Sequence, residues 1–280
     1  MQASYRQILV HVDPTRAVPQ RLAVARDIAG RNGASLAALY TATPSFVELP
    51  YAAEAGPSVA ADLLQFDEER RQRTLKAFDE AMKGPGPMAS WSQTDEVPTV
   101  AAFAQQALYA DLLVLGQDDR RDEAAAAVPP DFVASVLSIS GRPAVVVPYI
   151  GPGRAIGDTV AIAWKPTPEA ARAVSAAMPF LQRAARVHVF AWGAAEQPAV
   201  GGTVLGLESY LRAHGVQATW HRGGPEPHAL GELLLSRAFD VGADLLVMGC
   251  YGHSRAREWI LGGATRTVLA GMTLPVLMAH

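Results

Sequence analysis

The sequence predicts an α/β fold with two doubly wound domains, each built on a parallel sheet of five strands. Short apolar segments alternate with longer amphipathic segments, which is the pattern of strands joined by crossover helices. This pattern runs through the first half of the chain and starts again near residue 158, which indicates an internal duplication. Right-handed crossovers leave the doubly wound form as the natural arrangement. The 280 residues also match two domains of about 100 to 200 residues each.

Both halves open with the same three elements. A short apolar strand that ends in Pro and Thr comes first, an alanine-rich helix with apolar residues at helical spacing follows, and a second strand comes next. In the first half these elements are expected within residues 7–15, 21–30 and 34–41, and in the second half within 158–167, 169–183 and 186–192.

The later elements also occur in both halves. A proline, Pro98 or Pro227, precedes the helix that leads into the next buried strand. The remaining strands are expected at 89–91, 111–116 and 142–147 in the first half, and at 218–220, 244–249 and 274–278 in the second. Between the halves, Gly151–Gly157 is rich in Gly and Pro and indicates a linker. The predicted domains are therefore residues 1–150 and 157–280.

One segment of the first half has no counterpart in the second. Residues 44–67 contain three prolines and little periodicity, so they are expected to form a loop, either a functional lid or a solvated connection. The next residues, 68–82, alternate in charge and are expected to form an exposed helix.

The composition argues against several classes of partner. A net charge of -3, without a long basic block, does not favour nucleic acid. The apolar runs are much shorter than the roughly 20 residues that span a bilayer, and the N-terminus passes directly into the first strand, so neither a membrane segment nor a signal peptide is expected. The single cysteine fits a reducing compartment. The expected localisation is cytoplasmic.

Glycines that follow the strand 244–249 form the main candidate binding motif. Gly249, Gly252 and Gly262 have the spacing G-x2-G-x9-G. Glycines in such a loop permit positive φ angles and the close backbone approach that a pyrophosphate needs. Gly262 and Gly263 then lead into a final helix near Ala264, whose first amides and dipole favour an anion. The expected ligand is a nucleotide.

The motif and the duplication together resemble the universal stress protein family, in which G-x2-G-x9-G followed by Ser or Thr marks the members that bind ATP. The resemblance extends over nearly the whole chain, which is similar to a tandem, two-domain UspA-like protein. It implies Rossmann-like domains of the adenine nucleotide alpha hydrolase type. It also implies ATP, or ADP or AMP, with magnesium, bound in the C-terminal domain of a stress-response sensor or regulator.

The resemblance also assigns roles to residues of the second domain. In the family, an Asp at the end of the first strand holds the adenosine, and this position is Asp13 in the first domain and Lys165 in the second. A carboxylate accepts hydrogen bonds from adenine or ribose, whereas an ammonium group only donates them. Trp192 stands where the family has a small residue against the base, and its indole either stacks on adenine or fills the pocket. The expected binding residues are Lys165, Trp192, Gly249, Gly252, His253, Ser254, Gly262, Gly263, Ala264 and Thr265.

The two domains differ at this loop. The first-domain equivalent, Gly116–Glu123, lacks the second glycine and carries acidic side chains that would repel a triphosphate. The first domain is therefore expected to have lost nucleotide binding, with Asp13 kept as a turn residue. In the second domain Gly263 replaces the family's Ser or Thr, and Thr265 either supplies a hydroxyl instead or caps the helix.

Two alternative functions remain open. A nucleotide-free scaffold that acts through protein contacts is supported by Lys165, Trp192 and Gly263. A slow ATPase has the same fold, but a Walker motif, a paired carboxylate and a general base are all missing beside the loop, so no catalytic residue is assigned. The histidines show no metal-ligand spacing, and no metal site is assigned.

The closing strands indicate how the domains associate. Single-domain proteins of the family pair through this strand, and both 142–147 and 274–278 are apolar here. The chain is expected to form its own pseudo-dimer through these strands. A further homodimer and an unknown protein partner are left open.

Overall fold

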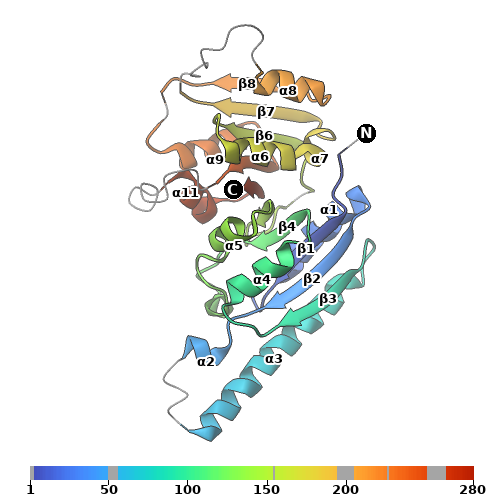
Figure 1. Cartoon of the computed structure of the whole chain (residues 1–280), viewed down its shortest axis with the longest axis vertical. Coiled ribbons are helices and arrows are strands. Elements are labelled where there is room, and N and C mark those ends of the chain that lie inside the picture. Colours follow the sequence, from blue (N-terminus) through green and yellow to red (C-terminus); the bar gives the residue numbers. More distant parts are fainter. Residues whose placement is uncertain (1–2, 50–55, 154, 194–204, 226, 251–262) are drawn as a thin grey trace. The chain divides into compact units, whose positions relative to one another are not determined.

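The structure is a computed structural model that describes residues 3–49, 56–153, 155–193, 205–225, 227–250 and 263–280. The chain forms two compact units (Figure 1). The first unit contains Tyr5–Arg142 and Tyr149–Gly151, and the second contains Pro143–Pro148 and Pro152–His280 together with the N-terminal residues up to Ser4. The domain limits 1–150 and 157–280 remain a prediction. In the structure, residues 143–148 pack with the second half of the chain.

The first unit contains a parallel sheet in the order β3-β2-β1-β4. The central strand β1 pairs on one side with β2 and on the other with β4, so that Ile8 lies between Leu36 and Leu112. β1, β2 and β4 are mostly apolar and buried because helices cover both faces of a parallel sheet, whereas the edge strand β3 has the sequence ASWSQT and is buried only at Ala89. The strands are β1 Gln7–Val12, β2 Ser35–Thr41, β3 Ala89–Thr94 and β4 Leu112–Gly116.

Helices α1 and α4 bury one face each against this sheet. Leu22 and Ile28 of α1 are fully buried, and α1 ends at Gly33, whose φ of 61° is the left-handed value that closes many helices. Phe103 of α4 is also fully buried. The helices are α1 Val18–Asn32, α2 Ser45–Glu48, α3 Pro57–Met82, α4 Thr99–Ala107, the 3-10 helix η2 Glu123–Ala127, and α5 Phe132–Ser140.

The second unit contains a sheet in the order β5-β10-β9-β6-β7-β8. Its strands are parallel except that β5 runs antiparallel to β10. The strands are β5 Ala144–Val147, β6 Thr159–Trp164, β7 Arg186–Ala191, β8 Thr219–Arg222, β9 Leu245–Gly249 and β10 Val276–Ala279. The helices are α6 Pro168–Ala176, α7 Met178–Leu181, α8 Leu207–Ala213, α9 Leu230–Asp240 and α11 Ala264–Gly271.

The predicted α/β fold is confirmed, with five of the described strands from each half of the sequence. The two closing strands pair as expected, since Val146 of β5 lies opposite Val276 of β10 and neither side chain is exposed. β5 therefore completes the sheet of the second unit, although it belongs to the first half of the sequence. No helix within the described ranges is long and apolar enough to span a bilayer.

Two predicted elements differ from the structure. The helix expected over 169–183 is divided into α6 and α7, because Pro179 has no amide hydrogen to donate to a carbonyl one turn earlier. The loop expected over 44–67 contains α2, and α3 begins at Pro57 rather than at residue 68. Pro57 was interpreted as a loop residue, but proline is well accepted in the first turn of a helix. The part of α3 expected to be exposed buries Arg70 and Phe78.

Candidate functional site

The described part of the predicted nucleotide site lies at the carboxyl ends of the strands of the second unit. Lys165 directly follows β6, Trp192 directly follows β7, and Gly249 ends β9. Because β6 and β9 are parallel neighbours, Lys165 and Gly249 lie at the same edge of the sheet, where ligands bind in doubly wound folds. Four of the expected binding residues, Gly252, His253, Ser254 and Gly262, lie outside the described residues. The geometry of the glycine loop remains a prediction.

Gly249 packs tightly against the start of α6. A Cβ atom on this residue would lie 2.5 Å from the backbone nitrogen of Ala170 and 2.7 Å from the carbonyl carbon of Glu169. Backbone atoms cannot move aside as a flexible side chain can, so the close approach of α6 requires glycine at this position. This contact gives Gly249 a packing role. Its role in binding phosphate remains a prediction.

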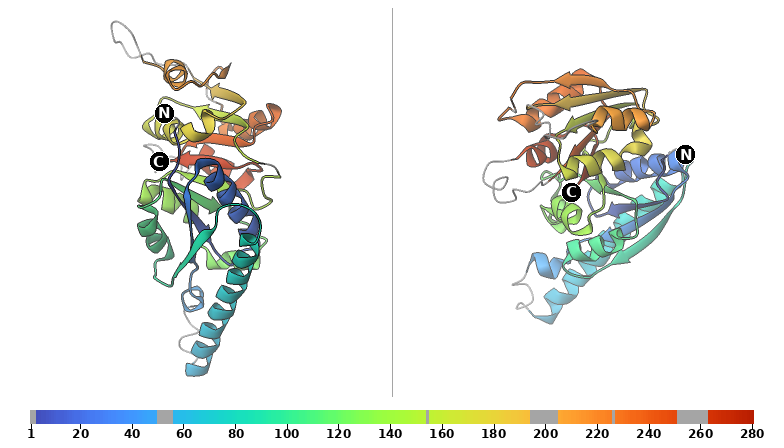
Figure 2. Two further views of the ribbon diagram at one scale, coloured as in Figure 1. Left: turned by 90° about the vertical axis from the view of Figure 1, so that its right-hand side faces the viewer. Right: turned by 45° about the horizontal axis from the view of Figure 1, so that its top comes forward.

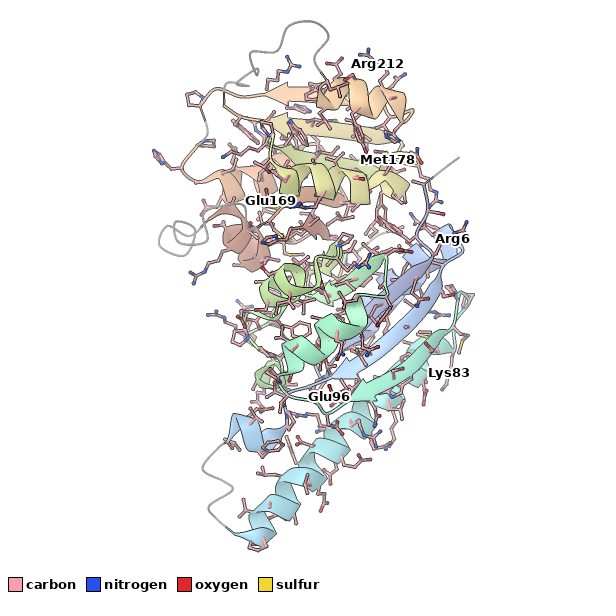
Figure 3. The ribbon with its side chains drawn as sticks, viewed as in Figure 1. Arg6, Lys83, Glu96, Glu169, Met178 and Arg212 are labelled. Carbon is pink, nitrogen blue, oxygen red and sulfur yellow. The ribbon has the colours of Figure 1, made fainter. Side chains whose placement is uncertain are left out.

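The first turn of α6 also places a buried carboxylate at this edge. Thr167 caps the helix, since its hydroxyl oxygen accepts a hydrogen bond of 3.3 Å from the Ala170 amide. Glu169 follows, with only 4% of its surface exposed, and one of its oxygens lies 3.8 Å from Arg172 (Figure 3). Lys165, four residues before Glu169 in the sequence, is exposed and carries the opposite charge. A phosphate beside Gly249 would meet both a repulsive and an attractive charge.

The helix start predicted after the glycine loop is confirmed. Gly263 is the N-cap residue of α11, with extended backbone angles and no side-chain cap, and Ala264 is the first helical residue. The Gly263 carbonyl accepts hydrogen bonds from the amides of Arg266 and Thr267. Thr265 is only 3% exposed, which fits a structural role in the first turn.

The Trp192 indole lies against Gly223, just beyond β8. A Cβ atom on Gly223 would overlap the Cδ1 and Nε1 atoms of the indole. On β7, the Phe190 ring is stacked with the indole, with centroids 6.1 Å apart and planes inclined by 24°. The half-buried indole therefore fills space at the β7–β8 side of the sheet. Stacking of adenine on this ring remains a prediction.

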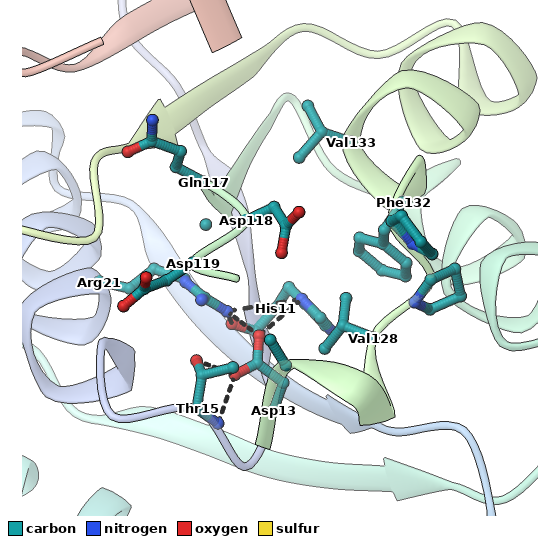
Figure 4. A pocket seen from close by; sticks show the side chains of 14 residues that line it. His11, Asp13, Thr15, Arg21, Gln117, Asp118, Asp119, Val128, Phe132 and Val133 are labelled. Carbon is teal, nitrogen blue, oxygen red and sulfur yellow. Dashed lines mark hydrogen bonds and ion pairs between the residues drawn. The ribbon is translucent and has the colours of Figure 1, made fainter. Parts of the chain in front are cut away.

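A small polar pocket lies in the first unit, at the carboxyl ends of β1 and β4 (Figure 4). Its volume of about 30 Å³ is enough for water but not for a nucleotide. Its polar lining comes from His11, Asp13, Thr15, Arg21, Gln117, Asp118 and Asp119, and its apolar wall includes Val128, Pro129, Phe132 and Val133.

Three charged or titratable side chains are packed together at the base of this pocket. His11, Asp13 and Arg21 are each no more than 2% exposed. Arg21 Nη1 donates to Asp13 Oδ2 at 2.6 Å and to the His11 carbonyl oxygen at 2.9 Å. Thr15 donates to Asp13 Oδ1 from its amide, at 2.9 Å, and from its hydroxyl. Both oxygens of the Asp13 carboxylate are thus occupied within the protein.

Their environment shifts the pKa values of two of these groups. Burial lowers the pKa of His11 to about 4, although Asp13 opposes the shift. The His11 Nε2 lies 3.1 Å from the Thr41 carbonyl, which only accepts, so the neutral ring carries its hydrogen on Nε2. Burial alone raises the pKa of Asp13, but Arg21 and His11 outweigh this effect and lower it to about 2. At neutral pH the cluster contains one buried ion pair and a neutral histidine.

The Arg21 guanidinium also lies directly over Gly116, the last residue of β4. A Cβ atom on Gly116 would lie 2.5 Å from Arg21 Cζ. Sequence reasoning retained Asp13 as a turn residue, which the Thr15 bonds bear out, but it missed this ion pair. The sequence feature that could have indicated the ion pair is the basic residue Arg21, which lies between Val18 and Leu22 on the buried face of α1.

The corresponding position of the second unit carries no such side chain. Arg21 stands eight residues after Asp13, and Ala173 stands eight residues after Lys165, the residue that takes the place of Asp13. Ala173 is fully buried in α6. Over Gly249, which ends β9 as Gly116 ends β4, the backbone of Glu169 and Ala170 takes the space that the Arg21 guanidinium takes in the first unit.

A second histidine contact lies in the second unit. His188 Nδ1 of β7 and His221 Nε2 of β8 are 3.0 Å apart, so one neutral ring donates to the other. Burial, with smaller contributions from His221 and Arg186, lowers the pKa of His188. Within the part of the chain that the structure describes, no three His, Cys, Asp or Glu side chains are grouped as metal ligands.

Two solved structures share this fold over nearly the whole chain. A universal stress protein from Archaeoglobus fulgidus DSM 4304 aligns with a TM-score of 0.67 and 16% identity, over 98% of this chain and 95% of its own. A functionally unknown protein from Pseudomonas aeruginosa PAO1 aligns with a TM-score of 0.58 and 16% identity, over 98% and 92%. No protein-family model and no curated protein sequence matches the chain. The chain therefore has the fold of the universal stress proteins, as its sequence motifs implied.

Proposed function

We propose that this chain is a stress-response protein whose second unit binds ATP, or the related ADP or AMP, together with magnesium. The single observation that carries the proposal is that Lys165 and Gly249 follow neighbouring parallel strands at one edge of the sheet, whereas the same edge of the first unit holds a buried ion pair. In the first unit Arg21 occupies the space over Gly116 and pairs with Asp13. In the second unit Lys165 takes the place of Asp13 and is exposed.

The proposed site gives each element a physical role. The carboxyl ends of β6 and β9 form the crevice in which doubly wound folds bind their ligands. The amides at the start of α11 favour phosphate, and exposed Lys165 adds a positive charge. Trp192 offers an aromatic ring near the end of β7. The role is binding rather than catalysis, with the nucleotide changing the stability of the second unit or its choice of protein partner.

Calorimetric titration with ATP, ADP and AMP in the presence of magnesium tests this proposal. We expect one saturable site per chain, and we expect Gly252→Val to abolish it, because the side chain would take the space of a phosphate. Gly206→Val is a matched control in the same unit, since Gly206 has open space around it and an allowed φ of -145°. Binding that survives Gly252→Val would remove the loop from the proposal.

One observation favours a second candidate, a nucleotide-free scaffold of the same fold. Glu169, whose Cβ would lie 2.9 Å from a Cβ on Gly249, carries a buried carboxylate, and a negative charge in this first turn of α6 would oppose a phosphate. If no nucleotide gives heat at millimolar concentration, the scaffold becomes the better explanation and protein partners become the object of the search.

A further inference from the structure

The N-terminal half of α3 has no buried residue. The buried residues of this helix are Arg70, Thr74, Phe78 and Met82, which all lie in its C-terminal half. Figures 1 and 2 both show the first turns of α3 extending beyond the sheet of the first unit. A helix of about 12 to 15 residues is only marginally stable without packing, even for favourable sequences. Residues 57–69 therefore need a surface to pack against.

Large apolar side chains are exposed in this region. Leu64 and Phe66 of α3 are 66% and 49% exposed, and Phe46, Val47 and Leu49 of the adjoining α2 region are 50%, 43% and 55% exposed. Single exposed apolar residues are common, but a concentration of them marks interaction surfaces. One flank of α3 is already occupied within the chain, because Arg70 binds Glu48 and Asp67 at 3.0 and 2.9 Å and holds α2 in place. A partner would have to use another flank.

A self-complementary stripe runs along another flank. Leu64, Glu68, Arg71 and Leu75 follow the spacing i, i+4, i+7 and i+11, which places them on one face of the helix. Leu64 and Glu68 are exposed, whereas Leu75 is half-buried and the Arg71 side chain is 21% exposed, so the second half of the stripe borders the contact with β3. Leu64 lies as far before the Glu69–Arg70 bond as Leu75 lies after it, and Glu68 lies as far before this bond as Arg71 lies after it. An antiparallel copy of the same stripe would therefore present leucine to leucine and glutamate to arginine.

The charges around the centre of the helix follow the same arrangement. Residues 57–69 carry acidic side chains only, at Asp62, Asp67, Glu68 and Glu69. The basic side chains Arg70, Arg71, Arg73 and Lys76 begin directly afterwards, and the acidic Asp79 and Glu80 follow only near the end of the helix, opposite the uncharged residues 59 and 60 of an antiparallel copy. Two parallel copies would bring like charges together, whereas two antiparallel copies bring opposite charges together.

We propose that two copies of this chain pair through α3, antiparallel, about a two-fold axis at the Glu69–Arg70 bond. In this pair Leu64 packs against Leu75 of the second copy, and Glu68 meets Arg71 of the second copy. The contact is isologous, as most homodimer contacts are. Within one chain Glu68 and Arg71 already form an ion pair at 2.5 Å, and Arg71 also donates to Gln93 of β3 at 2.9 Å. The dimer joins two such pairs into one network, and it does not depend on nucleotide binding.

Molar mass in solution tests the pairing. We expect the full chain to have twice its mass of 29.7 kDa in sedimentation equilibrium at micromolar concentration, and Leu64→Asp to reduce it to the single mass. Leu64 is exposed, so the variant should keep the far-ultraviolet circular dichroism of the parent. Phe239→Asp is the matched control, because Phe239 is 82% exposed on α9 of the other unit, and it should leave the mass unchanged. A single mass for the parent, or an unchanged mass for Leu64→Asp, would overturn the proposal.

Charge reversal tests the polar part of the contact. Glu68→Arg or Arg71→Glu alone brings like charges together across the axis, and each should weaken dimerisation at least about tenfold. The double variant Glu68→Arg, Arg71→Glu exchanges the charges within each stripe and should restore the parent affinity. If the double variant is as weak as the single variants, the opposed charges do not meet as proposed.

Disulfide cross-linking tests the direction. Residues 64 and 75 of one helix are about 16 Å apart at 1.5 Å per residue, so they cannot form a bond within one chain. Across the proposed axis they are neighbours, so the double variant Leu64→Cys, Leu75→Cys should give a covalent dimer on oxidation. Leu64→Cys alone should not, because the two copies of residue 64 lie at opposite ends of the contact. The natural Cys250 is 1% exposed and provides a background control. Equal cross-linking of the single and double variants would rule out the antiparallel arrangement.

Discussion

Arg21 and Asp13 form an ion pair of 2.6 Å in which both side chains are almost completely buried. The pair lies at the carboxyl ends of β1 and β4, the edge of the sheet at which a doubly wound domain binds ligands. At the position of Asp13 the second unit has Lys165, so a cation stands there in place of a carboxylate.

Replacing Arg21 should destabilise the first unit strongly. Arg21→Ala leaves the Asp13 carboxylate buried without its counter-charge, and breaking a buried pair in this way costs about 3–5 kcal/mol. Urea unfolding followed by tryptophan fluorescence measures the change. Arg16→Ala is the matched control, because Arg16 pairs with Asp119 while its side chain is 62% exposed, and solvent-exposed pairs contribute little to stability. If both variants lost the same unfolding free energy, burial of the Arg21–Asp13 pair would not add to its contribution to stability.

Mild acid should destabilise the first unit through His11. Its pKa is about 4 in the folded chain and 6.5 ordinarily, so the unfolded chain binds the proton more readily. Stability is then fully present above pH 6.5 and falls as the pH decreases towards 4, by up to about 3 kcal/mol. Asp13, whose pKa is lowered from 3.8 to about 2, adds a further loss only below pH 3.8. Urea unfolding at a series of pH values measures this dependence.

A variant without the histidine separates its contribution from that of other groups. His11→Gln can still donate to the Thr41 carbonyl but does not titrate, so its unfolding free energy should vary less between pH 6.5 and 4 than that of the parent. An unchanged pH dependence in this variant would assign the acid sensitivity to another group.

The sequence predicted the strands more reliably than the residues that fill the site. Buried strands such as β4 and β9 are continuous apolar segments, so their positions follow from pattern alone. Arg21 was not predicted, because its ion pair depends on the distance between α1 and the end of β1, which no local pattern records. The start of α3 was missed because Pro57 fits either a loop or the first turn of a helix, and only packing distinguishes them.

Gly249 should be intolerant of a side chain, whether or not a ligand binds. In Gly249→Ala the new methyl group would meet backbone atoms of α6 at 2.5 and 2.7 Å, and overpacking of this kind costs about 1–3 kcal/mol. Thermal unfolding without nucleotide measures this loss. Gly224→Ala, at a loop glycine with nothing within 4 Å of where the Cβ would lie, should change stability by no more than about 0.5 kcal/mol. A fully stable Gly249→Ala variant would show that α6 can move away, and the packing role would be lost.

Glu169→Gln should strengthen nucleotide binding by the second unit. The carboxylate is buried in the first turn of α6, whose backbone packs against Gly249, and its charge would oppose the phosphates of ATP. Removal of a nearby like charge under partial screening corresponds to about 1 kcal/mol, or about fivefold in affinity. Titration calorimetry with ATP measures the change, and the gain should be larger for ATP than for AMP because more phosphate charge is present. Glu208→Gln, on the exposed surface of α8, should leave the affinity unchanged. If Glu169→Gln weakens binding instead, the carboxylate takes part in holding the ligand, and magnesium is the natural intermediary because its preferred ligands are oxygens.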